Sequence, residues 1–394
     1  MPYDFNKMID RKNTNSIKYD FAIERGKPAN VLPLWVADMD FATVSEVTEA
    51  LVKASTHGIF GYSEVKDEYF QVLKKWFSTH YHWDIERKWL IKTPGVVFAI
   101  AMAIRAFTKA GDSVMIQRPV YYPFSEAIIS NNRTLINSPL VYENGSYRVD
   151  FDDFEKKIME EKVKLFILCN PHNPVGRVWT KEELTRLGNI CVKHDVLIIS
   201  DEIHADFIYP GHVHTVFASM KHEFFDRTIT CTAPSKTFNL AGLQVSNIFI
   251  GNAQLKSRFK EEIRKTGYSQ LNTMGLIACQ AAYEYGEEWL TGLKEYLKEN
   301  LDFARDYIKM HIPKIKLVEP EGTYLLWIDF HDLNLSEEAL EDLISNKANL
   351  WLDGGTMFGP EGSGFQRINI ACQRETLAKA LEQLKNAIDH FDNV

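Results

Sequence analysis

The chain of 394 residues lacks several features that would direct it to particular classes of protein. Its 45 Lys and Arg residues are outnumbered by 53 Asp and Glu residues, so the net charge is −8, and the basic residues are not clustered. This balance argues against nucleic acid or an anionic membrane surface as the main partner. No apolar run approaches the roughly 18–20 residues that span a bilayer. The acidic and aromatic first residues, 1–5, are unlike a signal peptide.

Cysteine is scarce, and no metal-binding spacing of Cys and His is present. The cysteines are odd in number, scattered and without a C-x-x-C pair: Cys169, Cys191, Cys231, Cys279 and Cys372. This usage indicates buried, reduced thiols in a cytoplasmic protein rather than a disulfide framework. His212-Val213-His214 is typical of a surface loop and not of a metal site. We therefore expect no metal, no nucleic acid and no membrane partner.

Apolar strands alternate with helical stretches from about residue 90 to 285, a pattern typical of an α/β sheet with crossover helices. The candidate strands are Val114–Gln117, Lys164–Cys169, Val196–Ser200, Thr228–Cys231 and Ser246–Ile250. Thr180 with Glu183 predicts a capping box that opens a helix, and Thr43 with Glu46 predicts another. These signals favour short crossovers and a mostly parallel sheet.

The pattern changes after Tyr285, which predicts a second, smaller domain. Residues 287–311 form a long amphipathic helical stretch that we expect to bridge the two domains. Strand-like and helical pieces follow, at Tyr324–Phe330, Ser336–Lys347, Phe365–Ala371 and Arg374–Phe391. The irregular N-terminal segment is expected to pack on this lobe. The predicted division is a large α/β domain of residues 45–285 and a small α+β domain of residues 1–44 and 286–394.

Lys236 is the most informative residue of the chain. It lies in the segment 232–243, just after the apolar run Thr228–Cys231, which indicates a buried strand end. Burying an ammonium group is unfavourable unless the group is paired or neutralised. A covalent Schiff base to a carbonyl cofactor is one strong reason for such a lysine.

Pyridoxal phosphate chemistry also needs an acid beside the pyridine nitrogen, and Asp201 is the candidate. Asp201 ends an apolar strand 35 residues before Lys236, at the edge where α/β sheets bind ligands. The alternative is a helix N-cap aspartate. In the loop 170–176, Asn173 follows another strand end and can donate to a phenolate oxygen, although a plain strand-to-helix connection is the other interpretation.

Three further segments carry candidate ligand groups. Gly95 precedes a helix whose first amides can bind a phosphate, although helix starts without a phosphate are commoner. Tyr121 can stack on a flat heteroaromatic ring or serve only in packing. Arg367 lies in a strand-like apolar stretch, where its planar fork can bind a carboxylate or form a structural salt bridge.

Taken together, these residues resemble the fold type I pyridoxal-phosphate enzymes of the class I/II aminotransferase superfamily, in order and spacing and over essentially the whole chain. The resemblance implies a mostly parallel, seven-stranded-type sheet in the large domain. Several segments are similar to the cystathionine β-lyase (C–S lyase) branch of the MalY/PatB type. These are Arg11 with 18–20, then 34–41, 201–206 and 321–327.

The resemblance implies a role for each candidate. Lys236 forms the Schiff base and abstracts the α-proton, Asp201 pairs with the pyridine nitrogen, and Tyr121 stacks on the ring. Asn173 contacts the phenolate oxygen and, with Arg367 and the backbone near Ala37, holds the substrate carboxylate. The phosphate candidates are the amides of Gly95, Val96 and Val97 and the hydroxyl of Ser235. Tyr62 matches a tyrosine that reaches the phosphate of the neighbouring subunit, which implies a homodimer with shared active sites.

The chain departs from many aminotransferases at three positions. His204 stands where many have Tyr, Ala233 where many have Ser, and Gln244 where many have Arg. These departures argue against a standard aminotransferase, and the resemblance implies a carbon–sulfur β-lyase that cleaves L-cystathionine and related S-substituted cysteines by α,β-elimination to a thiol (homocysteine), pyruvate and ammonia. Lys236, Tyr62 or Tyr121 would protonate the sulfur. The alternatives are an aminotransferase acting on an amino acid and a 2-oxo acid, and a regulator that binds a transcription factor.

Overall fold

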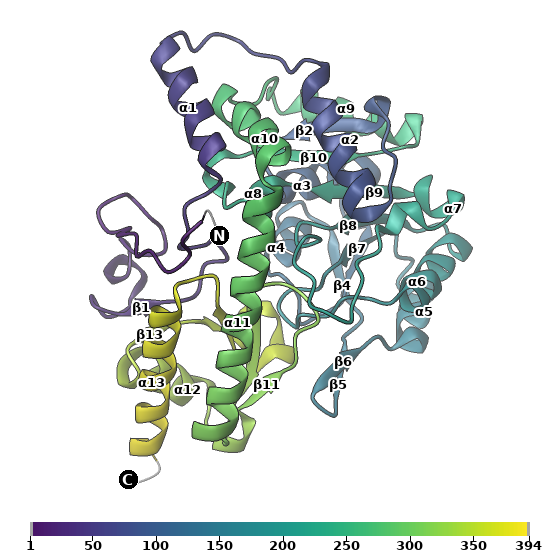
Figure 1. Cartoon of the computed structure of the whole chain (residues 1–394). Coiled ribbons are helices and arrows are strands. Elements are labelled where there is room, and N and C mark those ends of the chain that lie inside the picture. The colour runs from purple at the N-terminus through teal and green to yellow at the C-terminus, as the bar shows by residue number, and fades with distance from the viewer. Residues whose placement is uncertain (1–2, 392–394) are drawn as a thin grey trace.

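The computed structural model describes residues 3–391, which form a seven-stranded and a four-stranded sheet joined by a long helix (Figure 1). The first two and last three residues of the predicted small domain lie outside the described residues. The strands of the large sheet all come from residues 90–249, and those of the smaller sheet from residues 316–369. The domain bounds given above stay a prediction.

The large sheet is mixed but mostly parallel, as the sequence predicts. Its order is β2 (Leu90–Thr93), β10 (Ser246–Phe249), β9 (Thr228–Thr232), β8 (Leu197–Asp201), β7 (Leu165–Cys169), β3 (Ser113–Ile116) and β4 (Thr134–Asn137). All neighbours from β9 to β4 pair in parallel, while β10 runs antiparallel to both β2 and β9. The expected strands are present, with ends shifted by a residue or so.

Both faces of this sheet are buried, because successive side chains of a strand point to opposite faces. On β7, Leu165, Ile167 and Cys169 face one core, while Phe166 and Leu168 face the other. The first core is covered by α3 (Val96–Phe107), α4 (Pro123–Ser130) and α9 (Ala253–Lys265). The second is covered by α5 (Phe151–Glu160), α6 (Lys181–Lys193) and α7 (His222–Phe225). The central strands are therefore continuous apolar runs in the amino-acid sequence.

One predicted capping box is present and the other is wrong. Thr180 accepts from the amide of Glu183, and the Glu183 side chain accepts from the amide of Thr180, so α6 begins as expected. At α1 (Ser45–His57) the N-cap is Val44, and the Thr43 hydroxyl instead donates to the carbonyl of Phe238. That bond joins the start of α1 to the segment carrying Lys236. Helix α10 (Thr273–Tyr285) packs against α1 and also against α2 (Asp67–Tyr81).

The smaller sheet is antiparallel and has the order β11 (Lys316–Val318), β12 (Leu325–Asp329), β15 (Phe365–Asn369) and β14 (Asp353–Gly354). Helix α11 (Glu287–His311) runs from the large sheet to this one, as Figure 1 shows. Helices α12 (Glu337–Asp342), which continues as a π-helical turn to Lys347, and α13 (Arg374–Phe391) complete this part.

The N-terminal segment packs on this part, as predicted, because β1 (Leu32–Pro33) pairs in parallel with β13 (Leu350–Trp351). The remaining strands, β5 (Val141–Glu143) and β6 (Ser146–Arg148), form a separate hairpin. None of the helices in residues 3–391 combines the length and apolar composition that a membrane span requires.

Candidate active site

The candidate residues meet where three parallel strands end side by side. Cys169, Asp201 and Cys231 are register partners across β7, β8 and β9. The loops that follow these strands therefore leave the sheet from one edge, the edge at which open α/β sheets bind ligands. Asn173 lies in the loop after β7, and Lys236 lies in the short helix α8 (Pro234–Thr237) that follows β9.

A cavity of about 150 Å³ lies at this edge. The structure brings most of the predicted site residues to its wall. Its lining is Ala37, Val96, Val97, Tyr121, Cys169, Asn173, Asp201, Ile203, His204, Ser235, Lys236 and Ala241. A second cavity of about 520 Å³ shares Ala37, Lys236 and Ala241 with the first and extends outward along the N-terminal segment. The lysine therefore stands at the junction of an inner and an outer cavity.

Asp201 is buried, and its carboxylate accepts one hydrogen bond in the structure, from the amide of Ile203 at 3.1 Å. Burial raises the pKa of Asp201 to about 7, although that amide and the charge of Lys236 act in the opposite direction. A carboxylate held this way gains most from a cationic N–H donor placed in the cavity. A protonated pyridine nitrogen is such a donor.

The amine of Lys236 donates to the carbonyl oxygen of Ala37 at 2.7 Å. Burial and, to a lesser extent, the charge of Arg367 lower the pKa of Lys236 to about 8, although the charges of Asp38 and Asp201 act to raise it. A substantial fraction of the amine is therefore neutral near pH 8. A neutral amine is the form that attacks a carbonyl carbon and that accepts a proton.

Arg367 is buried and lies beside the cavity rather than on its wall. Its guanidinium donates to Asn173 Oδ1 and to the carbonyl of Trp35, each at 3.0 Å, and forms an ion pair with Asp353. Its Nε has no hydrogen-bond partner among the described residues. The structural salt bridge, between Arg367 and Asp353, is thus present. It holds the guanidinium where it also donates to Asn173.

His204 lies on the cavity wall with a buried Nδ1 that has no hydrogen-bond partner in residues 3–391. Burial lowers the pKa of His204 well below its usual value, and the charges of Lys236 and Arg367 act in the same direction. The ring is therefore neutral and retains one unused polar nitrogen. Such a buried, unpartnered atom is explained most simply by a polar ligand.

Two backbone features bear on the predicted phosphate contacts. Gly95 is the N-cap of α3 with φ of 142°, a conformation that favours glycine, and Val96 and Val97 follow at the cavity wall. The first amides of a helix have no partner within the helix and attract anions. Ser235 reaches the wall as well, whereas Ala233 and Gln244 do not. Among the described residues, Lys236 is the only Lys or Arg in the lining of the cavity.

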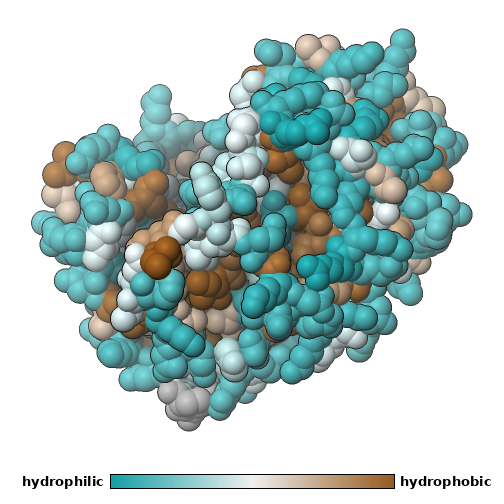
Figure 2. Space-filling model, turned by 90° about the horizontal axis from the view of Figure 1, so that it is seen from above, coloured by the Kyte–Doolittle hydropathy of each residue, from teal (hydrophilic) through white to brown (hydrophobic). Residues whose placement is uncertain are grey.

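Of the predicted residues that do not line the cavity, Gly95 and Arg367 lie next to it, whereas Tyr62 lies on the surface. Its side chain is 98% exposed, in the loop between α1 and α2, where Ile59 and Phe60 are exposed too. Figure 2, seen from the side on which this loop lies, shows hydrophobic side chains gathered among polar ones. Contiguous exposed apolar side chains are typical of a contact surface.

Some residues of the site were not predicted from the sequence. Asp353 neutralises Arg367 from a two-residue strand that no periodicity marks. From the sequence, Tyr324 is expected only as the start of a strand-like piece and as part of a segment similar to the C–S lyase branch, yet its hydroxyl donates to the carbonyl of Ala37 at 3.0 Å. Outside the cavity, the expectation of a surface loop is wrong for His214, which is buried with its Nε2 3.0 Å from a carboxylate oxygen of the buried Glu202. Within the described residues, no three His, Cys, Asp or Glu side chains are grouped so as to hold a metal ion.

The donor set fits pyridoxal phosphate. A buried acid with one backbone partner, a partly neutral lysine, an aromatic wall and free helix amides stand around one cavity. These are the groups that a pyridine nitrogen, an aldehyde, a flat ring and a phosphate require.

Residues 29–384 match the family model "Aminotransferase class I and II", and the chain belongs to this family. The cystathionine beta-lyase PatB of Bacillus subtilis (strain 168) is 40% identical over 385 residues, which cover 98% of this chain and 100% of that protein. Protein MalY of Escherichia coli (strain K12) is 33% identical, covering 98% and 99%. The structure of cystalysin from Treponema denticola, which contains a pyridoxal 5'-phosphate cofactor, superimposes with a TM-score of 0.96 at 41% identity, covering 99% and 100%.

Proposed function

We propose that this chain is a pyridoxal-phosphate-dependent carbon–sulfur β-lyase. It cleaves L-cystathionine and related S-substituted cysteines by α,β-elimination, releasing a thiol (homocysteine), pyruvate and ammonia. The observation that carries the proposal is the single cavity that joins Lys236, Asp201 and Asn173 at one sheet edge, in a chain similar over its full length to a cystathionine β-lyase.

Pyridoxal 5'-phosphate, when bound, supplies an acceptor for the electron pair left by the α-proton of the substrate. Lys236 is the amine that holds the cofactor and the base that removes this proton. Asp201 would hold the pyridine N–H, Tyr121 would stack on the ring, and His204 would offer its unused nitrogen. The remaining cofactor contacts in the proposal are Asn173, Ser235, Gly95, Val96 and Val97, with Tyr62 from a second subunit.

The substrate carboxylate would be held by Arg367, with Asn173 and the backbone at Ala37. Because Asn173 Oδ1 accepts from Arg367, its amide NH2 remains available as a donor. The leaving sulfur needs a proton, and Lys236, Tyr62 and Tyr121 are the candidates to give it. Burial raises the pKa of Tyr121, so the phenol keeps its proton at neutral pH and can donate it.

We also propose a cytoplasmic homodimer with shared active sites. The exposed Ile59, Phe60 and Tyr62 support a subunit contact at the loop between α1 and α2. All five cysteines are buried and unpaired, which supports a reducing compartment.

The test is to incubate the purified holoenzyme with L-cystathionine and no 2-oxo acid, and to follow pyruvate and free thiol together. Equal and sustained release of both is expected. If neither is released, and adding 2-oxoglutarate converts an amino donor to its keto acid, the protein is an aminotransferase. A Lys236→Ala variant should release neither product, which controls for contaminating lyase.

A further inference from the structure

The segment Trp35–Ala42 is held by side chains along its whole length. Each of its eight carbonyl oxygens accepts a hydrogen bond from a side chain outside the segment. The donors are Arg367, Asn369, Lys236, Tyr324, Arg11, Asn239, Gln373 and Trp289. A non-helical, non-strand segment satisfied in this way has a fixed backbone, since losing any bond leaves a partly buried carbonyl unpaired.

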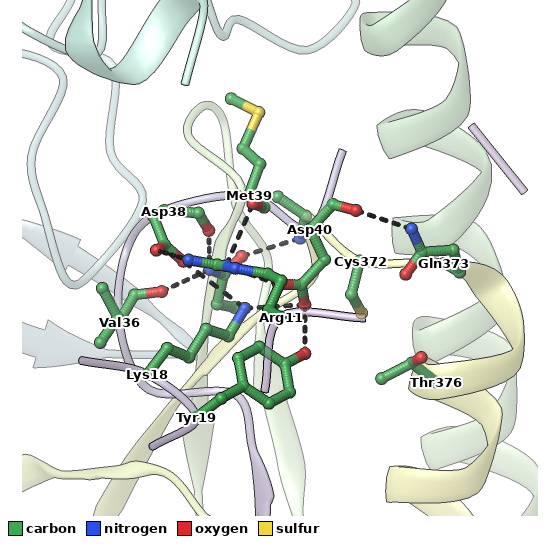
Figure 3. Close-up of polar contacts among 12 residues, drawn as sticks. Arg11, Lys18, Tyr19, Val36, Asp38, Met39, Asp40, Cys372, Gln373 and Thr376 are labelled. Atoms are coloured by element: carbon green, nitrogen blue, oxygen red, sulfur yellow. Dashed lines mark hydrogen bonds and ion pairs between the residues drawn. The ribbon is translucent and has the colours of Figure 1, made fainter. Parts of the chain in front are cut away.

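The carboxylates of the same segment are held by charged side chains of the N-terminal residues, as Figure 3 shows. Arg11 forms ion pairs with Asp38 at 2.6 Å and Asp40 at 2.7 Å, and Lys18 lies 2.8 Å from Asp40. Tyr19 donates to Asp40 at 3.0 Å. Burial alone would raise the pKa of Asp40, but Lys18 and Arg11 lower it, so this carboxylate stays ionised.

Ala37 is where this fixed segment meets the candidate active site. Its carbonyl oxygen accepts from Lys236 Nζ at 2.7 Å and from the Tyr324 hydroxyl at 3.0 Å. A carbonyl oxygen has two lone pairs, so these two donors use its whole capacity. Burial raises the pKa of Tyr324, which therefore remains a donor across the working pH range.

We propose that Tyr324 is a positioning residue for Lys236, and that it keeps the lysine a base by using one of the two lone pairs of the carbonyl to which the free amine donates. A second donor on the same oxygen makes the carbonyl a weaker acceptor, so the ammonium form of the lysine gains less from its hydrogen bond to Ala37 while the phenol is in place. Its neutral form loses little, because an amine donates weakly and keeps its lone pair directed into the cavity. The shared carbonyl therefore favours the neutral amine and fixes its direction.

The other charged and titratable groups around Lys236 do not replace this effect. Asp38 belongs to the fixed segment, and Arg367 to β15. Asp201 ends β8, His204 lies in the loop after it, and Tyr121 lies in the loop after β3. Asp38 and Asp201 act by charge and in the opposite direction to Arg367. Within residues 3–391 none of these side chains hydrogen-bonds the amine, which donates to the carbonyl of Ala37.

The consequence for turnover rests on the proposed function. Once a substrate has freed Lys236, its neutral amine takes the α-proton with the nitrogen lone pair and becomes an ammonium. The electron pair of the broken C–H bond is delocalised into the cofactor. To remove the α-proton, the amine must be neutral and must lie within hydrogen-bond reach of the α-carbon's proton. The hydrogen bond to Ala37 holds the free amine in the cavity for this step.

The first experiment compares the wild-type and Tyr324→Phe holoenzymes in the pH dependence of pyruvate release from L-cystathionine. The Tyr324 ring packs edge-on against Phe207 with centroids 4.9 Å apart, so Phe keeps this contact and the fold. We expect the rise of kcat with pH to move up by about half to one pH unit, with KM changed less than about twofold. An unmoved profile, or a loss of bound cofactor, contradicts the proposal.

Tyr209→Phe is the matched control. The Tyr209 hydroxyl is also buried, but it has no hydrogen-bond partner among the described residues, and Tyr209 is outside the cavity. Removing it makes the same chemical change without touching Ala37. Its pH profile should coincide with that of the wild type, and a shift equal to that of Tyr324→Phe would also contradict the proposal.

A second readout does not depend on the lyase reaction. The full-length proteins are stripped of cofactor, and the rate at which pyridoxal phosphate restores the visible absorbance is measured against pH. Only the neutral amine of Lys236 attacks the aldehyde, so the midpoint reports its pKa. The midpoint pH of this reconstitution should be higher for Tyr324→Phe than for the wild type, and it should be unchanged for Tyr209→Phe. If the wild type releases no pyruvate, the proposed function fails, and this midpoint still decides the role of Tyr324.

Discussion

Lys18 Nζ lies 2.8 Å from the carboxylate of Asp40, and the two side chains expose 0% and 3% of their surface. This buried ion pair ties Lys18 to the segment Trp35–Ala42, to which Asp40 belongs and whose Ala37 carbonyl accepts from Lys236. Buried pairs add little net stability compared with apolar residues, but removing one partner leaves a buried charge. The N-terminal segment, though irregular, is therefore tied to the site by an interaction that tolerates little change.

Replacing Lys18 by Met should destabilise the protein by about 3–5 kcal/mol, the usual effect of breaking a buried ion pair. Chemical unfolding of the holoenzyme at fixed protein concentration measures this change. Lys260→Met, at an exposed position of α9, should change the free energy of unfolding by less than about 0.5 kcal/mol. Equal effects of the two substitutions would show that the Lys18–Asp40 pair is not important for stability.

Asp201 should make the cofactor-free protein less stable as pH rises. Its pKa is raised from 3.8 to about 7 by burial, so the folded state keeps a proton that the unfolded state releases. The stability linked to this proton is fully present below about pH 4, is lost progressively up to about pH 7, and stays lost above it. At about 1.4 kcal/mol per pKa unit, the loss is on the order of 4 kcal/mol.

The measurement is the free energy of unfolding of cofactor-free wild type and Asp201→Asn from pH 5 to 8. The difference between the two should grow with pH in favour of the variant, since the amide has no charge to bury. Bound cofactor should reduce the slope in the wild type, because a pyridinium N–H pairs with the carboxylate. If the free energies of unfolding of the two proteins change with pH in parallel, burial does not raise the pKa of Asp201.

Much of the fold was predictable because the local signals agree with the global structure. The strands around Leu168 and Ile199 are continuous apolar runs, which is what burial on both sheet faces requires. The Thr180 capping box and the 25-residue helix α11 also follow from their own sequences. The same rule failed at Thr43, whose hydroxyl is used by Phe238, almost 200 residues away in the chain.

The unpredicted part of the site depends on contacts between distant segments. Lys236 and Asp201 stand at strand ends, so their pattern is visible in sequence. Asp353, Tyr324 and the carbonyl of Ala37 become partners only when β14, β12 and the N-terminal segment come together. No spacing or periodicity encodes a bond to a backbone carbonyl, so such a residue is found only from coordinates.

Arg367→Lys should raise KM for the amino-acid substrate by ~10- to 100-fold while leaving cofactor content unchanged. A lysine keeps the charge but loses the planar fork that binds a carboxylate at two points, and a hydrogen bond to a charged group contributes about 1.5–3 kcal/mol. Steady-state kinetics and cofactor absorbance measure the two quantities. Arg264→Lys, at an exposed position of α9, controls for the exchange itself. An unchanged KM would restrict Arg367 to its ion pair with Asp353.

Mixing two inactive variants tests whether subunits share active sites. Tyr62 is 98% exposed and Lys236 lies in the inner cavity, so one chain does not bring them together. If Tyr62 acts in the neighbouring subunit, a dimer of Lys236→Ala with Tyr62→Phe contains one intact site, with Lys236 from one chain and Tyr62 from the other. Each variant alone should be strongly impaired.

After unfolding and refolding an equal mixture, half of the dimers are mixed and one site in two is intact, so about a quarter of wild-type activity should return. Pyruvate release from L-cystathionine measures it, and each variant refolded alone is the control. A mixture of Lys236→Ala with Asp201→Asn should recover nothing, because both residues line the same cavity within one chain. Recovery in that second mixture, or none in the first, would mean that Tyr62 does not complete the site of a partner subunit.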